Sequence, residues 1–217
     1  MSLLNKQINE YKVVFWDFDG VIKESVHAKT EGYAQLFHSY GDHIKKKVVQ
    51  HHLKHSGVSR FEKIPFYYKE FLKIELSPEQ IQALCYKYSE LTKYTVLGSA
   101  WVPGVQKYLE LNYKRQKFFI VTGTPQNDIE WIVNKLNIKS IFSEIHGSPE
   151  TKTTIILNLI EKYKLKRKNC LIIGDALTDY EAAKQAKISF ILRNTAENKI
   201  YFNNILCNAI NDFMDLI

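Results

Sequence analysis

The sequence predicts a doubly wound α/β domain with a parallel sheet, into which an all-helical segment is inserted. Short apolar runs rich in β-branched and aromatic residues alternate with amphipathic stretches, which is the pattern of strands joined by crossover helices. Two of these runs end in pairs of acids. Because right-handed crossovers bring the ends of parallel strands to one edge of the sheet, we expect these acids to meet there.

The first strand is predicted within residues 13–22, where an apolar run ends in Asp17 and Asp19 and is followed by Gly20. The glycine can adopt the backbone conformation that a sharp turn requires. Two carboxylates at the mouth of a buried strand are costly unless positive charge compensates them. The pattern therefore favours a functional site over a solvated turn with incidental acids.

Residues 25–97, here called the helical segment, show helical spacing of apolar side chains and hardly any strand signal. Two capping boxes, which begin at Ser59 and at Ser77, mark the starts of two helices. We therefore expect a helical cap domain in residues 25–97 and an α/β core domain in residues 1–24 and 98–217.

The α/β pattern resumes near residue 98. The expected elements are a helix at 105–111, strands at 118–122 and 141–146, a helix at 151–163, a strand at 170–174, a helix at 178–186 and a strand at 189–192. A third capping box, led by Thr178, is expected to open the helix at 178–186. The tail from Asn198 is expected to end in a short helix.

The composition limits the class of protein. The net charge is +7, but the lysines are spread along the chain without a nucleic-acid-binding motif, so nucleic acid is not an expected partner. A positive surface would also attract anionic substrates. The three cysteines, Cys85, Cys170 and Cys207, lie outside any metal-binding spacing and are expected to be reduced core residues. No apolar run reaches the roughly 20 residues of a membrane span and residues 1–11 lack a signal peptide's apolar core, so we expect a cytoplasmic protein, whose oligomeric state stays open.

Polar residues with possible chemical roles follow the second strand. Thr122 and Gly123 offer a hydroxyl and free backbone N–H groups that could hold a phosphate. A helix-capping threonine is an equally good interpretation, and it suits Thr124 better than Thr122. Lys152 stands at the start of a later helix, where the helix dipole disfavours a cation. An ordinary surface lysine is the alternative there.

Asp175 and Asp179 follow the strand at 170–174. Asp179 could merely cap the next helix, but two strands that both end in acids favour a shared divalent cation. Oxygen ligands without His or Cys nearby favour Mg²⁺ over zinc. Phosphate transfer is a reaction that needs such an ion to neutralise charge.

Residues 17–22, Asp-Phe-Asp-Gly-Val-Ile, resemble the first signature of the haloacid dehalogenase-like (HAD) hydrolases. The threonine after the second strand, the lysine at the later helix and the Gly-Asp-x-x-x-Asp of residues 174–179 resemble the remaining signatures in their usual order. The resemblance covers residues 11–20 and about 98–192. It implies a Rossmann-like core and a phosphate-transferring enzyme.

The resemblance also implies roles for individual residues. Asp17 would be the nucleophile that forms an aspartyl-phosphate, and Asp19 the general acid and base. Thr122 and the Gly123 N–H would bind phosphoryl oxygens, and Lys152 would pair with Asp17 and the phosphate. Mg²⁺ would be held by the Asp17 carboxylate, the Asp19 backbone carbonyl and Asp175, with Asp179 in support.

One departure from the family pattern concerns the lysine. Many relatives have a proline directly after it, whereas Thr153 follows Lys152 here. Lys164, Lys166 and Lys168 are weaker alternatives, because they lie near the far end of that helix.

Because it has an acid at position 19, the chain resembles the phosphatase and phosphomutase branches of the family; dehalogenases are expected to lack this acid. The helical segment resembles the cap of the first cap class, and Gly57 to Arg60 resemble the cap loop that meets the substrate in β-phosphoglucomutase and related phosphatases. Arg60 could thus bind a second anionic group, or be an ordinary surface arginine. His51 and His55 share a helix face, but a zinc site there lacks a third ligand, so solvated or substrate-facing histidines are preferred.

These features together predict a Mg²⁺-dependent phosphatase that hydrolyses a small phosphate monoester, either a sugar phosphate or a small phosphorylated acid such as phosphoglycolate. A phosphomutase of the β-phosphoglucomutase kind is the first alternative, because it would share every core residue. A binding protein that has the HAD fold without turnover is the second.

Overall fold

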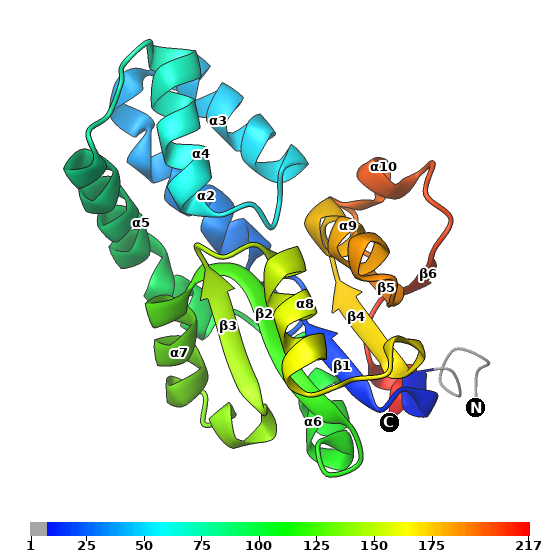
Figure 1. The fold of residues 1–217 in the computed structure, drawn as a ribbon. Coiled ribbons are helices and arrows are strands. Elements are labelled where there is room, and N and C mark those ends of the chain that lie inside the picture. The colour runs from blue at the N-terminus through cyan, green and yellow to red at the C-terminus, as the bar shows by residue number, and fades with distance from the viewer. Residues whose placement is uncertain (1–7) are drawn as a thin grey trace.

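A six-stranded parallel sheet forms the centre of the computed structural model, which describes residues 8–217 (Figure 1). Its strands are β1 (Val13–Trp16), β2 (Lys117–Pro125), β3 (Glu144–Ser148), β4 (Cys170–Gly174), β5 (Ser189–Arg193) and β6 (Asn208–Ile210). Their order across the sheet is β3-β2-β1-β4-β5-β6. The chain runs outward from β1 to β3 and then returns to the other side of β1. The carboxyl ends of β1 and β4 are therefore the topological switch point, where open α/β sheets bind ligands.

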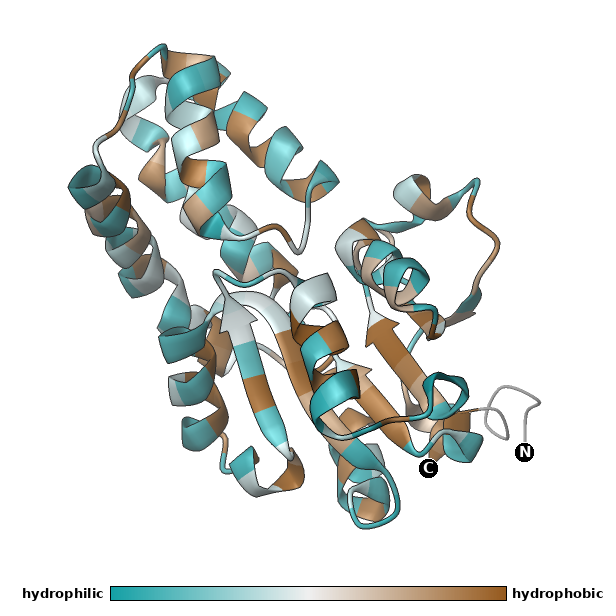
Figure 2. Cartoon of the chain, viewed as in Figure 1, coloured by the Kyte–Doolittle hydropathy of each residue, from teal (hydrophilic) through white to brown (hydrophobic). Residues whose placement is uncertain are grey.

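Helices cover both faces of the sheet, which confirms the doubly wound fold. Helices α6 (Val105–Asn112) and α7 (Gln126–Lys135) pack on one face, and α8 (Lys152–Lys162) and α9 (Leu177–Ala186) on the other. Figure 2 shows apolar strands between helices whose outer surfaces are largely hydrophilic.

The side chains of β1 explain why this strand is central. Val14 and Trp16 pack in the apolar cluster with α6 and α7, whereas Val13 and Phe15 pack in the cluster with α8 and α9. All four side chains are buried. A strand buried on both faces reads as a continuous apolar run, as the sequence does here.

The helical segment contains α2 (Val26–Leu36), α3 (Asp42–Lys54), α4 (Arg60–Tyr67), a π-helical turn (Tyr68–Leu72) and α5 (Pro78–Gly98). These helices surround an apolar cluster of their own. Figure 1 shows them beyond the carboxyl ends of β2 and β3, with α5 beside α7. The predicted capping box of α5 is confirmed, because Ser77 Oγ accepts from the Gln80 N–H and the Gln80 side chain accepts from the Ser77 N–H.

Two predicted elements are displaced. The strand expected at 141–146 begins only at Glu144, because Ile141 and Phe142 fill the core from a turn and not from a strand. The capping box led by Thr178 is wrong, since α9 already begins at Leu177. The Thr178 hydroxyl instead donates a hydrogen bond to the Ser56 carbonyl of the helical segment, at 3.5 Å.

The tail differs more from the expectation. It contains α10 (Lys199–Phe202), the unpredicted strand β6 and only a 3₁₀ turn (Met214–Leu216) near the end. Three further 3₁₀ turns span His38–Tyr40, Lys139–Ile141 and Arg167–Asn169. β6 carries too few apolar residues to give a strand signal.

The cysteine prediction is confirmed in part. All three cysteines are free thiols, and Cys85 and Cys170 are buried, but Cys207 is partly exposed and is not a core residue. None of the helices in residues 8–217 has the length and apolar character needed to cross a bilayer. The expectation about a signal peptide concerns residues 1–11, of which the first seven lie outside the described residues.

Candidate active site

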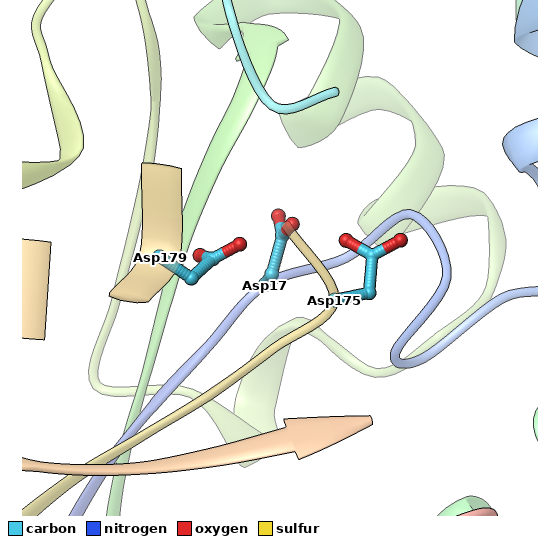
Figure 3. Close-up of side chains that lie close together, drawn as sticks. All are labelled: Asp17, Asp175 and Asp179. Carbon is cyan, nitrogen blue, oxygen red and sulfur yellow. The ribbon is translucent and has the colours of Figure 1, made fainter. Parts of the chain in front are cut away.

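Three buried aspartates meet at the switch point of the sheet. Asp17 directly follows β1, Asp175 directly follows β4, and Asp179 lies in the first turn of α9. One carboxylate oxygen from each lies within 4.8 Å of the others. In Figure 3 Asp17 stands between Asp179 and Asp175. Because parallel strands end at the same edge of the sheet, these three acids lie together, as the sequence predicts.

Lys152 supplies the positive charge beside two of these acids. Its Nζ lies 2.8 Å from Asp17 Oδ2 and 2.7 Å from Asp179 Oδ1. Burial disfavours the charged amine, but the two carboxylates outweigh it and hold the pKa of Lys152 above its usual value. Thr151 caps α8 by accepting from the Thr154 N–H, so the first helical residue points its side chain into the site.

The weaker lysine alternatives do not reach the acids. Lys164, Lys166 and Lys168 follow the far end of α8 and are exposed to solvent. Lys152 therefore lies beside Asp17, where the family pattern predicts the lysine, although no proline follows it.

Negative charge exceeds positive charge among these buried groups. Burial and the neighbouring carboxylates raise the pKa of Asp175 well above its usual value, and burial raises the pKa of Asp179 to about 7 although Lys152 opposes the shift. Asp179 is already engaged through both oxygens, by Lys152 and by the Ala176 N–H at 3.3 Å. A cluster of carboxylate oxygens with excess negative charge suits a hard divalent cation such as Mg²⁺. The donor set therefore fits the metal that the sequence predicts.

Asp19 lies in a separate hydrogen-bond network. Its carboxylate accepts from Ser25 Oγ at 2.6 Å, Lys29 Nζ at 2.5 Å and Thr124 Oγ1 at 2.8 Å. Burial opposes ionisation, yet Lys29 and the two hydroxyls hold the pKa of Asp19 below its usual value. Without a ligand, Asp19 is therefore ionised and held by three hydrogen-bond donors.

The interpretation of Thr124 as a helix cap is wrong. Residue 125 is the N-cap of α7, and the Thr124 hydroxyl points instead to Asp19. Thr122 is buried within β2, which continues to Pro125, and its Oγ1 accepts from the Thr124 N–H at 3.3 Å. Its neighbour Gly123 faces Gly57 so closely that a Cβ on Gly123 would lie 2.3 Å from the Gly57 carbonyl oxygen.

Both glycines line a small cavity of about 50 Å³ between the sheet and the helical segment. The cavity lies well below the roughly 300–1,000 Å³ of sites for drug-sized ligands. The sheet side contributes Asp17, Asp19, Thr122, Gly123 and Thr124. The helical segment contributes cationic and aromatic side chains, among them Lys29, Tyr33, His52, Arg60, Lys63 and Tyr88.

Arg60 is not a surface residue, as only 4% of it is exposed. Its guanidinium forms an ion pair with Asp128 of α7 at 2.9 Å, hydrogen-bonds Ser89 of α5 and lies 4.6 Å from the Tyr88 ring centre. A carboxylate of the protein thus already compensates its charge. Binding of a second anionic group by Arg60 stays a prediction.

Sequence reasoning missed Lys29, His52 and Lys63, which the docked helical segment places in the cavity. The spacing could have revealed Lys63, because it lies three residues after Arg60 and so on the same face of α4. His51 and His55 stack on each other, with ring centres 3.9 Å apart. In residues 8–217 the aspartate cluster is the one group of three or more such side chains within reach of a common metal ion, so a histidine zinc site does not form there.

The chain matches one protein-family model over most of its length. The family model described as haloacid dehalogenase-like hydrolase matches residues 14–193, and thus both the α/β elements and the helical segment. No curated protein matches the chain.

Solved structures share the whole architecture at low sequence identity. A protein from Haemophilus somnus 129PT, described as a predicted phosphoglycolate phosphatase, is 19% identical over 95% of this chain and 96% of its own, with a TM-score of 0.71. The β-phosphoglucomutase of Clostridium difficile is 20% identical over 95% and 93%, with a TM-score of 0.75. YfnB from Bacillus subtilis, described as a HAD-hydrolase bound to magnesium, is 15% identical over 95% and 97%, with a TM-score of 0.68. At such identities the similarity establishes a common fold.

Proposed function

We propose that this chain, which belongs to the haloacid dehalogenase-like hydrolases, is a Mg²⁺-dependent phosphatase that hydrolyses small phosphate monoesters through an aspartyl-phosphate on Asp17. The observation that carries the proposal is the pairing of Asp17 with Lys152 at 2.8 Å, beside a cavity that is lined by both Asp17 and Asp19. A nucleophile, a cation beside it and a separate proton carrier are what a two-step phosphoryl transfer requires.

In the first step, a carboxylate oxygen of Asp17 attacks phosphorus while the ester P–O bond breaks. Asp19 gives its proton to the leaving oxygen, so the alcohol departs neutral. Lys152, the Thr122 hydroxyl and the Gly123 N–H bind the phosphoryl oxygens and stabilise the charge that develops on them. Lys152 also fixes the orientation of the Asp17 carboxylate.

Asp19 changes its protonation state between the steps. Without substrate its lowered pKa keeps it ionised. A phosphate dianion that binds beside it raises the pKa of the carboxyl group, because like charges disfavour the ionised form. Asp19 therefore takes up a proton from solvent when substrate binds and gives it to the leaving oxygen in the first step. In the second step Asp19 accepts a proton from water, which attacks phosphorus, and the P–O bond to Asp17 breaks and restores the Asp17 carboxylate. Asp19 loses its proton to solvent once phosphate has left.

The carboxylates of Asp17 and Asp175 would hold Mg²⁺ together with the Asp19 backbone carbonyl, supported by Asp179. When bound, Mg²⁺ supplies positive charge that offsets the repulsion between the anionic phosphoryl group and the aspartates. The excess negative charge of the three buried acids supports this assignment.

Residues 25–97 would act as a cap domain that excludes bulk water during the reaction. The contact between Gly57 and Gly123 supports this role. The small cavity favours a substrate with few carbon atoms over a large one.

A phosphomutase remains the second candidate. The cap loop at Gly57 to Arg60 lines the cavity beside Gly123, and the fold resembles that of a β-phosphoglucomutase. Such an enzyme would pass the phosphoryl group from Asp17 to a second sugar instead of to water. Transfer between sugars without release of phosphate would identify it.

The first test is phosphate release from a panel of phosphorylated sugars and acids, with Mg²⁺, with EDTA and with the Asp17→Asn variant. The proposal expects release that requires both Mg²⁺ and Asp17. Release by Asp17→Asn at the wild-type rate would contradict the proposed nucleophile. A wild-type protein without release or transfer on any compound would favour the non-catalytic binding protein.

A further inference from the structure

The cavity contains three cationic side chains of the helical segment, and two of them already have acidic partners. Lys29 pairs with Asp19, and Arg60 pairs with Asp128. The third cation, Lys63, is 2% exposed, and no carboxylate in the described part of the chain forms an ion pair with it. A buried cation without a counter-charge is costly, so this position calls for a functional explanation.

His52 holds the Lys63 amine in place. Lys63 Nζ lies 3.0 Å from His52 Nδ1 and 3.5 Å from the His52 carbonyl oxygen. The His52 ring in turn packs against the Tyr33 ring, with centres 4.7 Å apart. A protonated lysine has three N–H groups, and His52 accepts from at most two of them. One N–H donor therefore remains for a ligand in the cavity.

The charges around this pair are predominantly positive. Burial, together with Lys29 and Lys152, lowers the pKa of Lys63 to about 7, while Glu62 alone acts in the opposite direction. Burial and neighbouring lysines also hold the pKa of His52 well below its usual value. An anionic group that enters the cavity would relieve this repulsion and keep Lys63 protonated.

We propose that Lys63, positioned by His52, binds a second anionic group of the substrate and thereby determines specificity. That group is a carboxylate or a second phosphate, at the end of the molecule away from the transferred phosphoryl group. The inference rests on the proposed function and deepens it, because it assigns a substrate class to the same site. The residue proposed to bind the second anionic group is therefore Lys63 and not Arg60, whose charge Asp128 already offsets.

The test compares substrates of similar size that differ in the second group. These are 2-phosphoglycolate, with a carboxylate, ethylene glycol bisphosphate, with a second phosphate, and ethyl phosphate, with neither. The wild-type protein should prefer one or both of the first two. Lys63→Met should lose roughly tenfold to hundredfold in kcat/KM on the preferred compound, which is the value of a hydrogen bond to a charged group. Its loss on ethyl phosphate, which has no second anionic group, should be clearly smaller than its loss on the preferred compound.

Three further variants make the comparison specific. Lys63→Gln, which keeps a donor without the charge, should lose the same preference, whereas Lys63→Arg should retain part of it. Lys46→Met removes an exposed lysine of α3 and should change nothing. The compound that suffers more from Lys63→Met identifies the second group as carboxylate or phosphate. An unchanged preference in Lys63→Met would overturn the proposal and leave the phosphatase assignment intact.

A binding measurement separates this inference from the proposed function. In the Asp17→Asn background with Mg²⁺, calorimetric titration should give tighter binding of 2-phosphoglycolate or of the bisphosphate than of ethyl phosphate. Adding Lys63→Met should abolish that difference. If wild-type protein hydrolyses no compound, the proposed function fails, and the titration still decides the role of Lys63. Equal affinities with and without Lys63 would overturn that role.

Discussion

Gly57 of the helical segment lies directly against Gly123 of β2, with no room for a side chain between them. A Cβ on Gly123 would stand 2.3 Å from the Gly57 carbonyl oxygen, and Gly57 itself has a φ of +79°. The contact joins a loop of the helical segment to the part of β2 that we expect to bind phosphate. The close approach of the helical segment to β2 therefore depends on the absence of two side chains.

Gly123→Ala tests this dependence. The extra methyl group would push the helical segment away from β2, and we expect a clear loss of kcat/KM with little change in melting temperature, because the backbone at Gly123 does not need a positive φ. The control is Gly98→Ala, since a Cβ on Gly98 meets nothing within 4 Å. Equal activity of both variants would show that the Gly57 contact is unimportant for turnover.

Lys152→Met removes the positive charge between Asp17 and Asp179. Loss of one partner from a buried ion pair typically costs about 3–5 kcal/mol, so we expect a lower free energy of unfolding in EDTA. Mg²⁺ should restore part of this loss, because it replaces the missing charge. Urea unfolding with and without Mg²⁺ measures both effects, with Lys166→Met as the exposed control. A loss that Mg²⁺ leaves unaltered would argue against a metal at these acids.

Asp19→Asn removes the proposed proton carrier. Hydrolysis of alkyl phosphates should slow by about 100- to 10,000-fold, the usual contribution of general acid and base catalysis. An aryl ester such as p-nitrophenyl phosphate should suffer less, because nitrophenolate leaves without a proton. Equal losses on both kinds of ester would show that Asp19 does not protonate the leaving group.

The buried Lys63 predicts a pH dependence of stability. Its pKa is about 7 in the folded protein and near 10.5 as the ordinary value. Between these values the unfolded chain binds a proton that the folded chain lacks, so the free energy of unfolding falls as the pH is lowered from about 10 to about 7. Lys63→Met lacks this contribution. Urea unfolding at several pH values should show that the free energy of unfolding of Lys63→Met rises relative to that of the wild type as the pH falls. If the free energies of the two proteins change with pH in parallel, the assigned pKa is wrong.

The sequence was sufficient for the acids and the lysine of the site because one rule places them. Asp17 and Asp175 directly follow parallel strands, and Lys152 begins a helix at the same edge, so their proximity follows from the topology alone. A residue next to the end of a β-strand can be placed in the fold from the strand order alone. The fold class was predictable for the same reason.

The remaining contacts join residues that lie far apart in the chain. Thr124 donates to Asp19 across 105 sequence positions, and Arg60 of the helical segment pairs with Asp128 of α7. The local sequence around Thr124 contains no information about a partner so distant in the chain, and it therefore favours a helix-capping role for this residue. Lys29 escaped notice similarly, since its partner Asp19 lies ten residues away across a turn.

The central claim is that Asp17 carries the phosphoryl group. The most direct test mixes excess protein and Mg²⁺ with a hydrolysed ester whose phosphoryl group is labelled, quenches the reaction in acid within a single turnover, and maps the labelled peptide. We expect label on Asp17, which decays as phosphate appears and is absent from Asp17→Asn. Label on another residue, or turnover by Asp17→Asn at the wild-type rate, would contradict it.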